Sequence, residues 1–261
     1  MRRLRYMLTI PLVSFLTVLL TNMSAYSDEI PSIKVSGPLF EPYIMIKEGS
    51  TKGIIVDLVQ LALKEAGYQA KFDITNWARA FTETKKGLID AIIPAMKSAD
   101  REVFLHYPHQ PVINLQMVLV AAKDNPATFD GTMESLRSYS IGRVRKARVS
   151  PVFDEARETG VINVQERNSF GLLIKAAAFD RIDLAALDKN LALWSSKKQG
   201  LSSRIRVLQP ILGSVPVYVA FSKKRLSKKI ATDVGNILER FHQDGTVDTL
   251  IERYLGSNYG E

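Results

Sequence analysis

The sequence predicts an α/β fold with two lobes, whose parallel or mixed sheets are joined by a two-strand hinge. Strands and helices alternate in two successive series, a pattern typical of parallel sheets with right-handed crossovers. Residues 85–96 (KKGLIDAIIPAM) and 179–188 (FDRIDLAALD) repeat one unit, in which a helix end precedes Ile-Asp and a short buried strand. Two amphipathic helices follow the second series. If they pack on the first lobe, the chain crosses between the lobes twice, near 108–116 and 209–219.

These crossings divide the chain into a predicted lobe I, 28–112 with 220–261, and a predicted lobe II, 113–219. In the first series, apolar spacing predicts a helix over 54–66, which Gly67 ends as a C-terminal cap. A second helix over 77–86 ends at Gly87. The strands expected around these helices are 33–36, 70–74 and 89–93.

The second series begins after the first crossing. Pro151 is suited to the start of a helix over 151–158, because its missing N–H would have no partner there. Ser169 is the expected N-cap of a helix that runs to Phe179. The strands expected in this series are 118–122, 140–144, 161–164, 182–187, 205–208 and 217–221. A short helix is expected over 191–195, and the two closing helices follow Ser227 and Thr246.

Residues 1–27 have the composition of a cleaved export signal. Arg2, Arg3 and Arg5 precede the apolar stretch 7–20, and small residues stand at Ala25 and Ser27. An uncleaved membrane anchor is the alternative, although this stretch is short for a membrane span. The chain has no cysteine, which excludes a disulfide framework, a thiolate metal site and a lipid-modified cysteine. We therefore expect a free protein in the periplasm.

The charge of the chain argues against a nucleic-acid partner. The formal net charge is +8, and the three arginines of the predicted signal account for three of these charges. The remaining lysines and arginines form no concentrated stripe with interleaved aromatic residues, which nucleic-acid binding would require. His106 and His109 lack a nearby third ligand, so we expect no metal site and no cofactor.

Over about 30–256, ordered motifs resemble those of periplasmic solute-binding proteins of family 3, the amino-acid class that serves ABC importers. The family's aromatic-proline loop corresponds to 41–43 (EPY), and its Gly-x-x-x-Asp-Leu segment to 53–58 (GIIVDL). The further matches are Trp77, 87–91 (GLIDA), 98–101 (SADR), the degenerate 107–111 (YPHQP) and 243–246 (QDGT). The resemblance implies a type II periplasmic-binding-protein fold. It also implies a monomer that closes on a small zwitterionic solute, most simply an amino acid, and delivers it to a membrane ABC permease.

By this resemblance, Arg101 binds the ligand α-carboxylate and Asp188 accepts the α-ammonium. A guanidinium suits the first role because it can bind a carboxylate with two parallel hydrogen bonds. Each residue has an alternative interpretation. Arg101 would instead be a surface residue paired with Asp100 or Glu102, and Asp188 would instead cap the helix that follows it.

The other candidate residues are aromatic, apolar, hydroxyl-bearing or basic. Trp77 would form a wall of the binding cleft on the first lobe, or it would pack on Phe81 in the core. Phe40 and Tyr43 would form the opposite wall of the cleft, or they would belong to the core. Residues 94–96 occupy positions where family members hold the carboxylate with backbone and hydroxyl groups. Met96 lacks the usual hydroxyl, and Ser98 could supply one. The loop 143–148 carries basic residues where the family often has Gly and a hydroxyl. If Arg145 or Arg148 faces the cleft, an anionic ligand becomes plausible; otherwise the loop is a solvated basic one.

Two other functions remain open at this point. One is an exported enzyme on the same fold, similar to cyclohexadienyl dehydratases, with Glu41, Glu83 and Asp188 as candidate acids and bases. The other is a soluble ligand-sensing module for a receptor, which would need only the same closure.

Overall fold

The fold is known from a computed structural model, which describes residues 30–145 and 147–256. Residues from Pro31 onward belong to one compact unit. The predicted export signal, 1–27, lies outside the described residues. Within the described ranges, no helix combines the length and the apolar composition that a membrane crossing requires.

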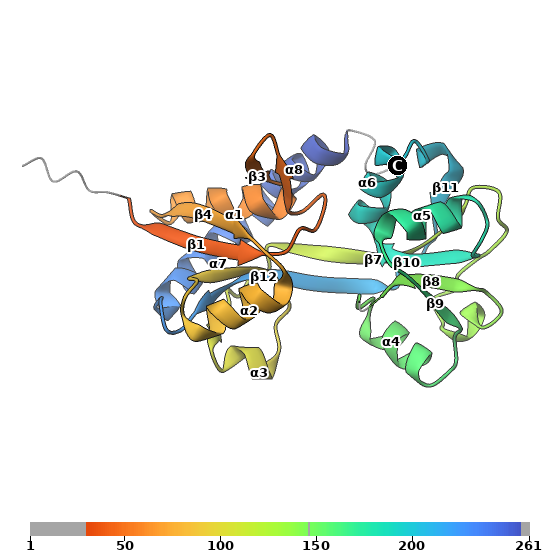
Figure 1. The fold of residues 1–261 in the computed structure, drawn as a ribbon, viewed down its shortest axis with the longest axis horizontal. Helices are drawn as coiled ribbons and strands as arrows, with labels where there is room; N and C mark the ends of the chain where they lie inside the picture. Colours follow the sequence, from red (N-terminus) through yellow and green to blue (C-terminus); the bar gives the residue numbers. More distant parts are fainter. Residues whose placement is uncertain (1–29, 146, 257–261) are drawn as a thin grey trace, which may run out of the picture. The chain divides into compact units, whose positions relative to one another are not determined.

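Among the described residues, ten strands form one sheet with the central order β4-β1-β5-β12-β7-β10-β8-β9. At one end, β1 (Ser32–Gly37) pairs in parallel with β4 (Gln69–Ile74) and β5 (Ala91–Ala95). At the other end, β8 (Ile141–Val144) pairs in parallel with β10 (Leu184–Asp188) and β9 (Val164–Arg167). The short strands β6 (Leu105–His106) and β11 (Ile205–Val207) pair with β12 and β7. We call the two ends, with their helices, the first and second lobes (Figure 1).

Two long antiparallel strands, β7 (Ile113–Ala122) and β12 (Gly213–Ser222), join the lobes. They pair with each other from Val217–Ile113 to Gly213–Met117. Beyond this segment, β12 pairs with β5 of the first lobe and β7 pairs with β10 of the second lobe. This is the predicted two-strand connection. The boundaries predicted for the lobes and the hinge, 28–112 with 220–261, 113–219, 108–116 and 209–219, stay predictions.

Helices cover the sheet in both lobes (Figure 1). The first lobe carries α1 (Ile54–Glu65), α2 (Trp77–Lys86), α3 (Ala99–Glu102), α7 (Lys228–Gln243) and α8 (Thr246–Leu255). The second lobe carries α4 (Pro151–Glu158), α5 (Phe170–Ala178) and α6 (Lys189–Lys198). The closing helices α7 and α8 pack against α1, the condition from which the two crossings were predicted. A two-stranded hairpin, β2 (Met45–Lys47) with β3 (Ser50–Lys52), and two 3₁₀ turns, Glu134–Leu136 and Ser202–Arg204, complete the elements.

Local capping explains why some helices begin and end where the sequence predicts. The Asn76 side chain accepts a hydrogen bond from the Arg79 N–H at the start of α2, and Gly87 ends that helix in the left-handed conformation, with φ 81°. At α4, the Ser150 hydroxyl accepts a hydrogen bond from the Phe153 N–H, and Pro151 is the first helical residue. Both helices have the predicted bounds.

All of the predicted strands differ from the observed bounds by one residue or more, and three strands and one helix show a physical reason. The strand expected over 161–164 begins only at Val164, because the N–H groups of Val161 and Ile162 donate to the Ala156 carbonyl at the end of α4. The strands expected over 89–93 and 182–187 begin two residues later, so that each Ile-Asp pair precedes its strand. The helix expected over 191–195 extends over α6, because Asp188 caps it earlier.

Candidate ligand-binding cleft

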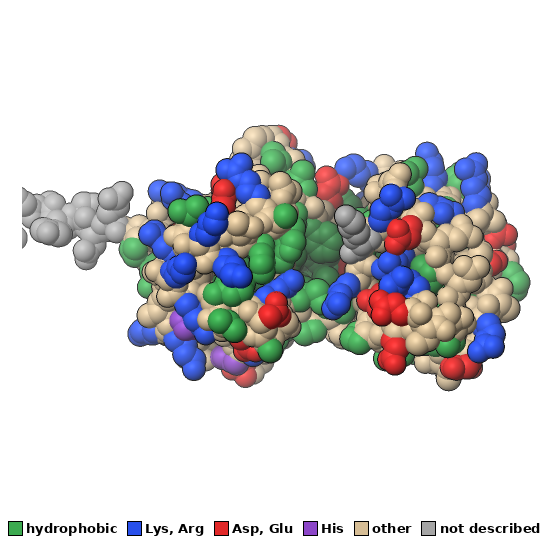
Figure 2. All heavy atoms as spheres, turned by 60° about the horizontal axis from the view of Figure 1, so that its bottom comes forward, with side chains coloured by type: hydrophobic (Ala, Val, Ile, Leu, Met, Phe, Trp, Pro, Cys, Tyr) green, Lys and Arg blue, Asp and Glu red, His purple; other side chains and the backbone are tan. Residues whose placement is uncertain are grey.

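A cleft of about 620 Å³ is lined by residues of both lobes and of the two connecting strands. Apolar side chains gather in this hollow in Figure 2. The first lobe contributes Phe40, Trp77, Met96 and Arg101. The second lobe contributes the segment 147–151, acidic residues of α4, Phe170 and Asp188, and Leu115, Met117 and Val215 come from β7 and β12. Its wall is therefore largely apolar, with a small number of charged groups.

Arg101 presents a guanidinium to the cleft from α3. Its Nη1 donates to the Met96 carbonyl at 2.9 Å, and its Cζ lies 5.3 Å from the centre of the Trp77 ring. Among the described residues, no carboxylate lies within ion-pair distance of Arg101. Glu102 instead pairs with Lys97, at 3.1 Å. The remaining N–H groups of Arg101 are therefore not committed to an acidic side chain of the described chain.

Trp77 serves the cleft and the packing of the first lobe together. It lines the cleft, and its ring centre lies 5.9 Å from that of Phe81, one turn further along α2. Phe81 in turn meets Phe104 edge to face at 5.4 Å. Trp77 therefore lines the cleft and also packs on Phe81, since one residue can stack on the core and expose part of its ring. Its part in ligand binding stays a prediction.

Asp188 is a buried carboxylate at the end of β10 and the N-cap of α6. Its Oδ1 accepts hydrogen bonds from the Leu191 N–H at 3.0 Å and the Tyr43 hydroxyl at 2.5 Å. The residue is 3% exposed and lines the cleft, and its Oδ2 has no hydrogen-bond partner. Burial raises the pKa of Asp188 to about 6, although the Tyr43 hydroxyl and the backbone N–H groups of Leu191, Gln116 and Asn190 act in the opposite direction. The capping interpretation is thus correct for one oxygen and leaves the other oxygen open.

Phe40 lies in the wall of the cleft, whereas Tyr43 lies in the core. Phe40 lines the cleft and stacks on Tyr43, with ring centres 5.1 Å apart. Tyr43 is fully buried, does not line the cleft, and reaches Asp188 across the lobes. Met96 lines the cleft, and its carbonyl accepts hydrogen bonds from Arg101 and from the Tyr107 hydroxyl.

The structure does not bring Ser98 and Arg145 into the cleft lining, so their part in binding stays a prediction. Ser98 precedes α3, and its hydrogen bond to Asp100 lowers the pKa of that carboxyl group. Arg145 is exposed and lies 3.4 Å from Glu166. The other basic candidate of this loop, Arg148, does line the cleft.

Sequence reasoning missed the acidic residues of α4. Asp154, Glu155 and Glu158 all line the cleft beside Pro151, at the i, i+3, i+4 and i+7 positions of one helical face. Phe153 and Ala156 form the buried face of the same helix. This periodicity was a usable signal. Within the described ranges, no group of three or more His, Cys, Asp or Glu residues is placed to hold a metal ion.

Comparison with known proteins provides a family and a fold. The family model described as bacterial extracellular solute-binding proteins, family 3, matches residues 34–257. No curated protein sequence matches the chain. Among solved structures, the chain is similar to the probable amino-acid ABC transporter extracellular-binding protein ytmK from Bacillus subtilis. The TM-score is 0.71 at 16% identity, over 88% of this chain and 100% of that one.

Two further solved structures are also similar to the chain. One is a histidine kinase sensor domain with similarity to periplasmic binding proteins, with a TM-score of 0.67 and 17% identity, over 88% of this chain and 98% of that one. The other is an ancestral amino-acid-binding protein that is a precursor of cyclohexadienyl dehydratase, with a TM-score of 0.64 and 18% identity, over 87% and 98%. At these identities the likeness concerns the fold alone. It confirms the predicted type II periplasmic-binding-protein fold.

Proposed function

Because the chain belongs to family 3 of the bacterial extracellular solute-binding proteins, we propose that it captures a zwitterionic amino acid in this cleft and delivers it to an ABC importer. One observation carries the proposal. An arginine without an acidic partner among the described residues and a buried carboxylate with one unpartnered oxygen line the same cleft, from different lobes. Those two groups complement the two charges of an amino acid.

Each end of the ligand would meet a group suited to it. The N–H groups of Arg101 that have no acidic partner among the described residues can donate to the α-carboxylate, and the charges on both partners strengthen these hydrogen bonds. Oδ2 of Asp188 can accept from the α-ammonium and so gain the partner it lacks. Trp77 and Phe40 can cover the carbon skeleton. Met96 and Ala147 stand where the family often has hydroxyl groups, so Arg101 would carry more of the carboxylate recognition.

Closure of the two lobes would follow from ligand contact with both. A ligand shifts the equilibrium toward a closed state only by its difference in affinity between the states. A ligand held by Arg101 alone gains nothing from closure, whereas one held also by Asp188 does. A micromolar dissociation constant corresponds to about −8 kcal/mol, which is sufficient to stabilise a closed state of low intrinsic population. Strands β7 and β12 would be the hinge.

A ligand panel tests this function directly. Residues 28–261 would be purified, and the thermal midpoint measured with each of the twenty amino acids and with sugars, organic acids and polyamines. We expect one or more amino acids to raise the midpoint, because ligand that binds only the folded state stabilises it. A rise with another solute class and with no amino acid would refute the amino-acid assignment.

Location and assembly belong to the same proposal. We infer that residues 1–27 are removed on export, and that the protein is periplasmic, monomeric and without a lipid anchor. N-terminal sequencing of the exported protein checks the cleavage, and a start at Asp28 is expected. Light scattering checks the monomer.

The two alternative functions are supported by different observations. A sensor role needs only the same closure, and one similar structure is a histidine kinase sensor domain; a nearby permease and ATPase gene pair would favour transport. For the enzyme alternative, the three candidate acids and bases do not all lie in the cleft. Glu41 accepts a hydrogen bond from Lys198 and Glu83 accepts one from Arg79, and neither residue lines the cleft. Asp188 does line it. Incubation with prephenate or arogenate, followed by product analysis, tests the enzyme alternative.

A further inference from the structure

We propose that one end of the first lobe is a docking surface for an anionic phospholipid membrane. Three segments form this surface, which we call the basic surface: 85–90 from the end of α2 to the start of β5, 102–106 from the end of α3 through β6, and 223–229 from the end of β12 to the start of α7. None of these residues lines the cleft. The proposal goes beyond the capture of a solute and does not depend on it.

Contacts between the three segments bring them together. Nζ of Lys223 donates to the Glu102 carbonyl, which joins the third segment to the second. Lys224 packs on Gly87 of the first segment, where an added Cβ would lie 2.9 Å from the Lys224 Cβ. Strand β5 begins beside this surface and leads to Met96, which lines the cleft. The basic surface and the cleft therefore lie at opposite ends of β5, and docking at one leaves the other accessible.

The basic surface carries lysines without acidic partners. Within the described ranges, no carboxylate pairs with five exposed lysines, Lys85, Lys86, Lys223, Lys224 and Lys228. The acidic residues of the same segments already have partners, because Asp90 pairs with Arg225 at 2.8 Å and Glu102 pairs with Lys97 at 3.1 Å. Lysine and arginine side chains are visible over the first lobe in Figure 2. The surface thus presents five positive charges that no carboxylate compensates.

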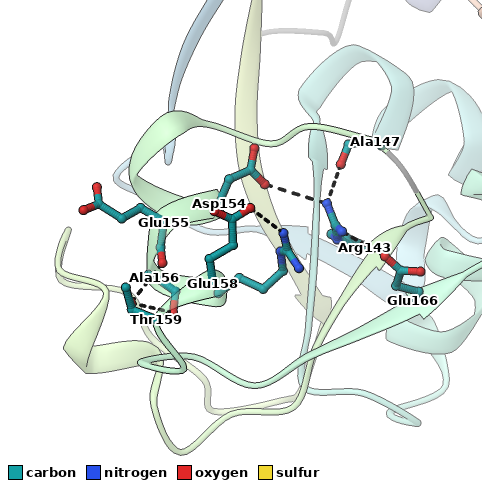
Figure 3. Close-up of polar contacts among 9 residues, drawn as sticks. Arg143, Ala147, Asp154, Glu155, Ala156, Glu158, Thr159 and Glu166 are labelled. Atoms are coloured by element: carbon teal, nitrogen blue, oxygen red, sulfur yellow. Dashed lines mark hydrogen bonds and ion pairs between the residues drawn. The ribbon is translucent and has the colours of Figure 1, made fainter.

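The second lobe shows the contrasting arrangement. Nη2 of Arg143 binds Glu166 at 2.8 Å, and its Nη1 lies 3.8 Å from Oδ1 of Asp154 (Figure 3). Arg157 binds Glu158 at 2.9 Å. Acidic neighbours compensate the basic side chains there. On the basic surface the lysines repel one another without such neighbours, so an anionic partner lowers the energy of holding them together.

The positive charges also act together on one point of the surface. Burial lowers the pKa of His106, and repulsion from Lys223 and Lys228 lowers it further. These lysines stand on either side of the turn between β12 and α7, yet both act on a residue of β6. The sequence does not reveal this cluster, because its lysines come from separate segments. Charges gathered in this way attract the phosphate groups of anionic lipids.

Two apolar side chains favour a membrane over other anionic partners. Val103 is 76% exposed and Leu88 is 64% exposed, and they are the most exposed large apolar residues that the structure describes. Both belong to the basic surface. Apolar side chains flanked by lysines are suited to a membrane interface, where they enter the acyl boundary while the lysine amino groups stay among the headgroups. A surface that is only solvated gains nothing from either side chain.

The connectivity of the chain also favours a membrane. Strand β1 begins at the same end of the lobe, since the Lys34 N–H donates to Oδ2 of Asp90 at 2.9 Å. The apolar stretch 7–20 of the predicted export signal precedes this strand, and ten residues, 21–30, separate it from Pro31. A segment of that length spans at most about 35 Å. While the signal is held in a membrane during export, the start of β1 and the basic surface stay near that membrane.

Vesicle binding tests the proposal. Residues 28–261 would be sedimented with vesicles of phosphatidylcholine alone and with vesicles of phosphatidylcholine and the anionic phosphatidylglycerol in about equal parts. We expect partitioning to be at least about tenfold stronger on the anionic vesicles at low salt, since each lysine near an anionic surface adds to the attraction. The preference should shrink at about 1 M salt, where the Debye length falls to about 3 Å.

Variants of matched charge locate the binding. The test variant removes three lysines of the basic surface, Lys86→Gln/Lys224→Gln/Lys228→Gln. The control variant removes three exposed basic residues of the second lobe, Lys123→Gln/Lys175→Gln/Arg181→Gln. We expect partitioning on anionic vesicles to fall at least about tenfold in the test variant and to stay within about twofold in the control. Circular dichroism checks that both variants fold.

A third variant, Leu88→Ser/Val103→Ser, tests the apolar part of the surface. We expect partitioning on anionic vesicles to fall about threefold to tenfold at low salt and at high salt alike, because salt does not screen apolar burial. Unchanged partitioning in this variant would overturn the part assigned to Leu88 and Val103.

The remaining outcomes are separate from those of the ligand panel. Equal partitioning on the two kinds of vesicle, no binding to either, or equal losses in the test and control variants would overturn the proposal. Binding to polyglutamate without binding to anionic vesicles would also overturn it, and would assign the surface to an acidic protein instead. Failure of membrane binding leaves the proposed function intact, because the basic surface and the cleft share no residue.

Discussion

The helix–strand units at 85–96 and 179–188 match where they build the fold and differ where they meet the cleft. In the first unit, Oδ2 of Asp90 accepts a hydrogen bond from the Lys34 N–H of β1, at 2.9 Å. In the second, Oδ2 of Asp183 accepts from the Ser140 N–H just before β8, at 2.7 Å. Each aspartate thus ties the start of its strand to the neighbouring strand. The repeated Ile-Asp pairs are structural.

The ends of the two strands carry opposite chemistry. Beyond β5 the chain reaches Met96 and then Arg101, a partly exposed cation packed near Trp77. At the end of β10 stands Asp188, an anion with 3% exposure. The comparison teaches that residues common to the two units support strand pairing, while the residues that differ line the cleft and are the ones proposed to bind the ligand. Four experiments can break or sharpen this division.

The largest expected effect is on the pH dependence of the free energy of unfolding, and the Asp188→Asn variant tests it. Burial raises the pKa of Asp188 to about 6, from an ordinary value of 3.8, so the folded state holds this proton more tightly than the unfolded state does. Its contribution to the free energy of unfolding is therefore fully present below pH 4 and is lost as pH rises through about 6. The loss amounts to about 3 kcal/mol in the ligand-free protein.

The Asp188→Asn variant should not show this pH-dependent loss of unfolding free energy. Urea unfolding of both proteins from pH 4 to pH 7 tests this, because the difference between their free energies of unfolding should change across that range. Parallel pH profiles of the two proteins would contradict an elevated pKa at Asp188. The same variant should bind the amino acid poorly, since the amide cannot supply a negative charge.

The next effect concerns Arg101→Ala, which removes the cation at the end of the first unit. Charge-assisted hydrogen bonds contribute about 1.5–3 kcal/mol, so we expect the dissociation constant of the amino acid to rise about a hundredfold. Arg79→Ala is the matched control, because Arg79 is an exposed arginine on α2 that pairs with Glu83. An unchanged dissociation constant in Arg101→Ala would remove Arg101 from the site.

How much of this was predictable depends on the range of the interactions. The helices 77–86 and 151–158 were predicted to the residue, because Asn76, Gly87, Ser150 and Pro151 act on the adjacent backbone. Arg101 and Asp188 could be proposed from the sequence because their family motifs are also local, and both line the cleft. The place of Tyr43 in the core rather than the wall was not predictable, since it depends on packing against Phe40 and Asp188 across the lobes.

The second-lobe loop shows the same limit. The sequence could not distinguish Arg145 from Arg148 as the residue facing the cleft, because the outcome depends on how the loop leaves β8. Arg145 leaves the cleft to approach Glu166 of β9, and Arg148 lines it. The charges of α4 were visible in the sequence, but their place in the lining of the cleft depends on the tertiary fold.

The third experiment tests the matching part of the two units through Asp90→Asn and Asp183→Asn. Each variant loses hydrogen bonds of a charged acceptor, and we expect a loss of about 2 kcal/mol in the free energy of unfolding. The dissociation constant of the amino acid should stay unchanged in both. A tenfold weaker affinity in either variant would mean that its aspartate serves the ligand and not only the fold.

The pH dependence of the free energy of unfolding gives a further test of the structural role of Asp183. The hydroxyl and N–H of Ser140 lower the pKa of Asp183, so the folded state binds this proton less tightly than the unfolded state does. Its stabilising contribution is present above the ordinary pKa of 3.8 and is lost as pH falls through the lower folded value. The deficit of Asp183→Asn in urea unfolding should therefore shrink on acidification below pH 4.

The smallest effects concern two contacts that join the same loop to α6 and its cap. The Tyr43 hydroxyl binds Asp188 in a fully buried position, whereas Glu41 accepts from Trp194 and Lys198 in a largely exposed one. We expect Tyr43→Phe to lower the free energy of unfolding by about 1.5 kcal/mol, because it leaves a buried carboxylate with one donor fewer. Glu41→Gln should cost about 0.5 kcal/mol or less, as exposed ion pairs do.

Burial alone should set this order, since both residues bind an ionisable side chain from nearby positions in one loop. The Lys198 hydrogen bond lowers the pKa of Glu41, so the small contribution of Glu41 is present above pH 4.5 and fades as pH falls. High salt should abolish it, because exposed charges are screened. The Tyr43 contact should persist in high salt. Equal losses in the two variants at 1 M salt would show that the Tyr43–Asp188 contact is not protected by burial, and would remove the basis for the elevated pKa of Asp188.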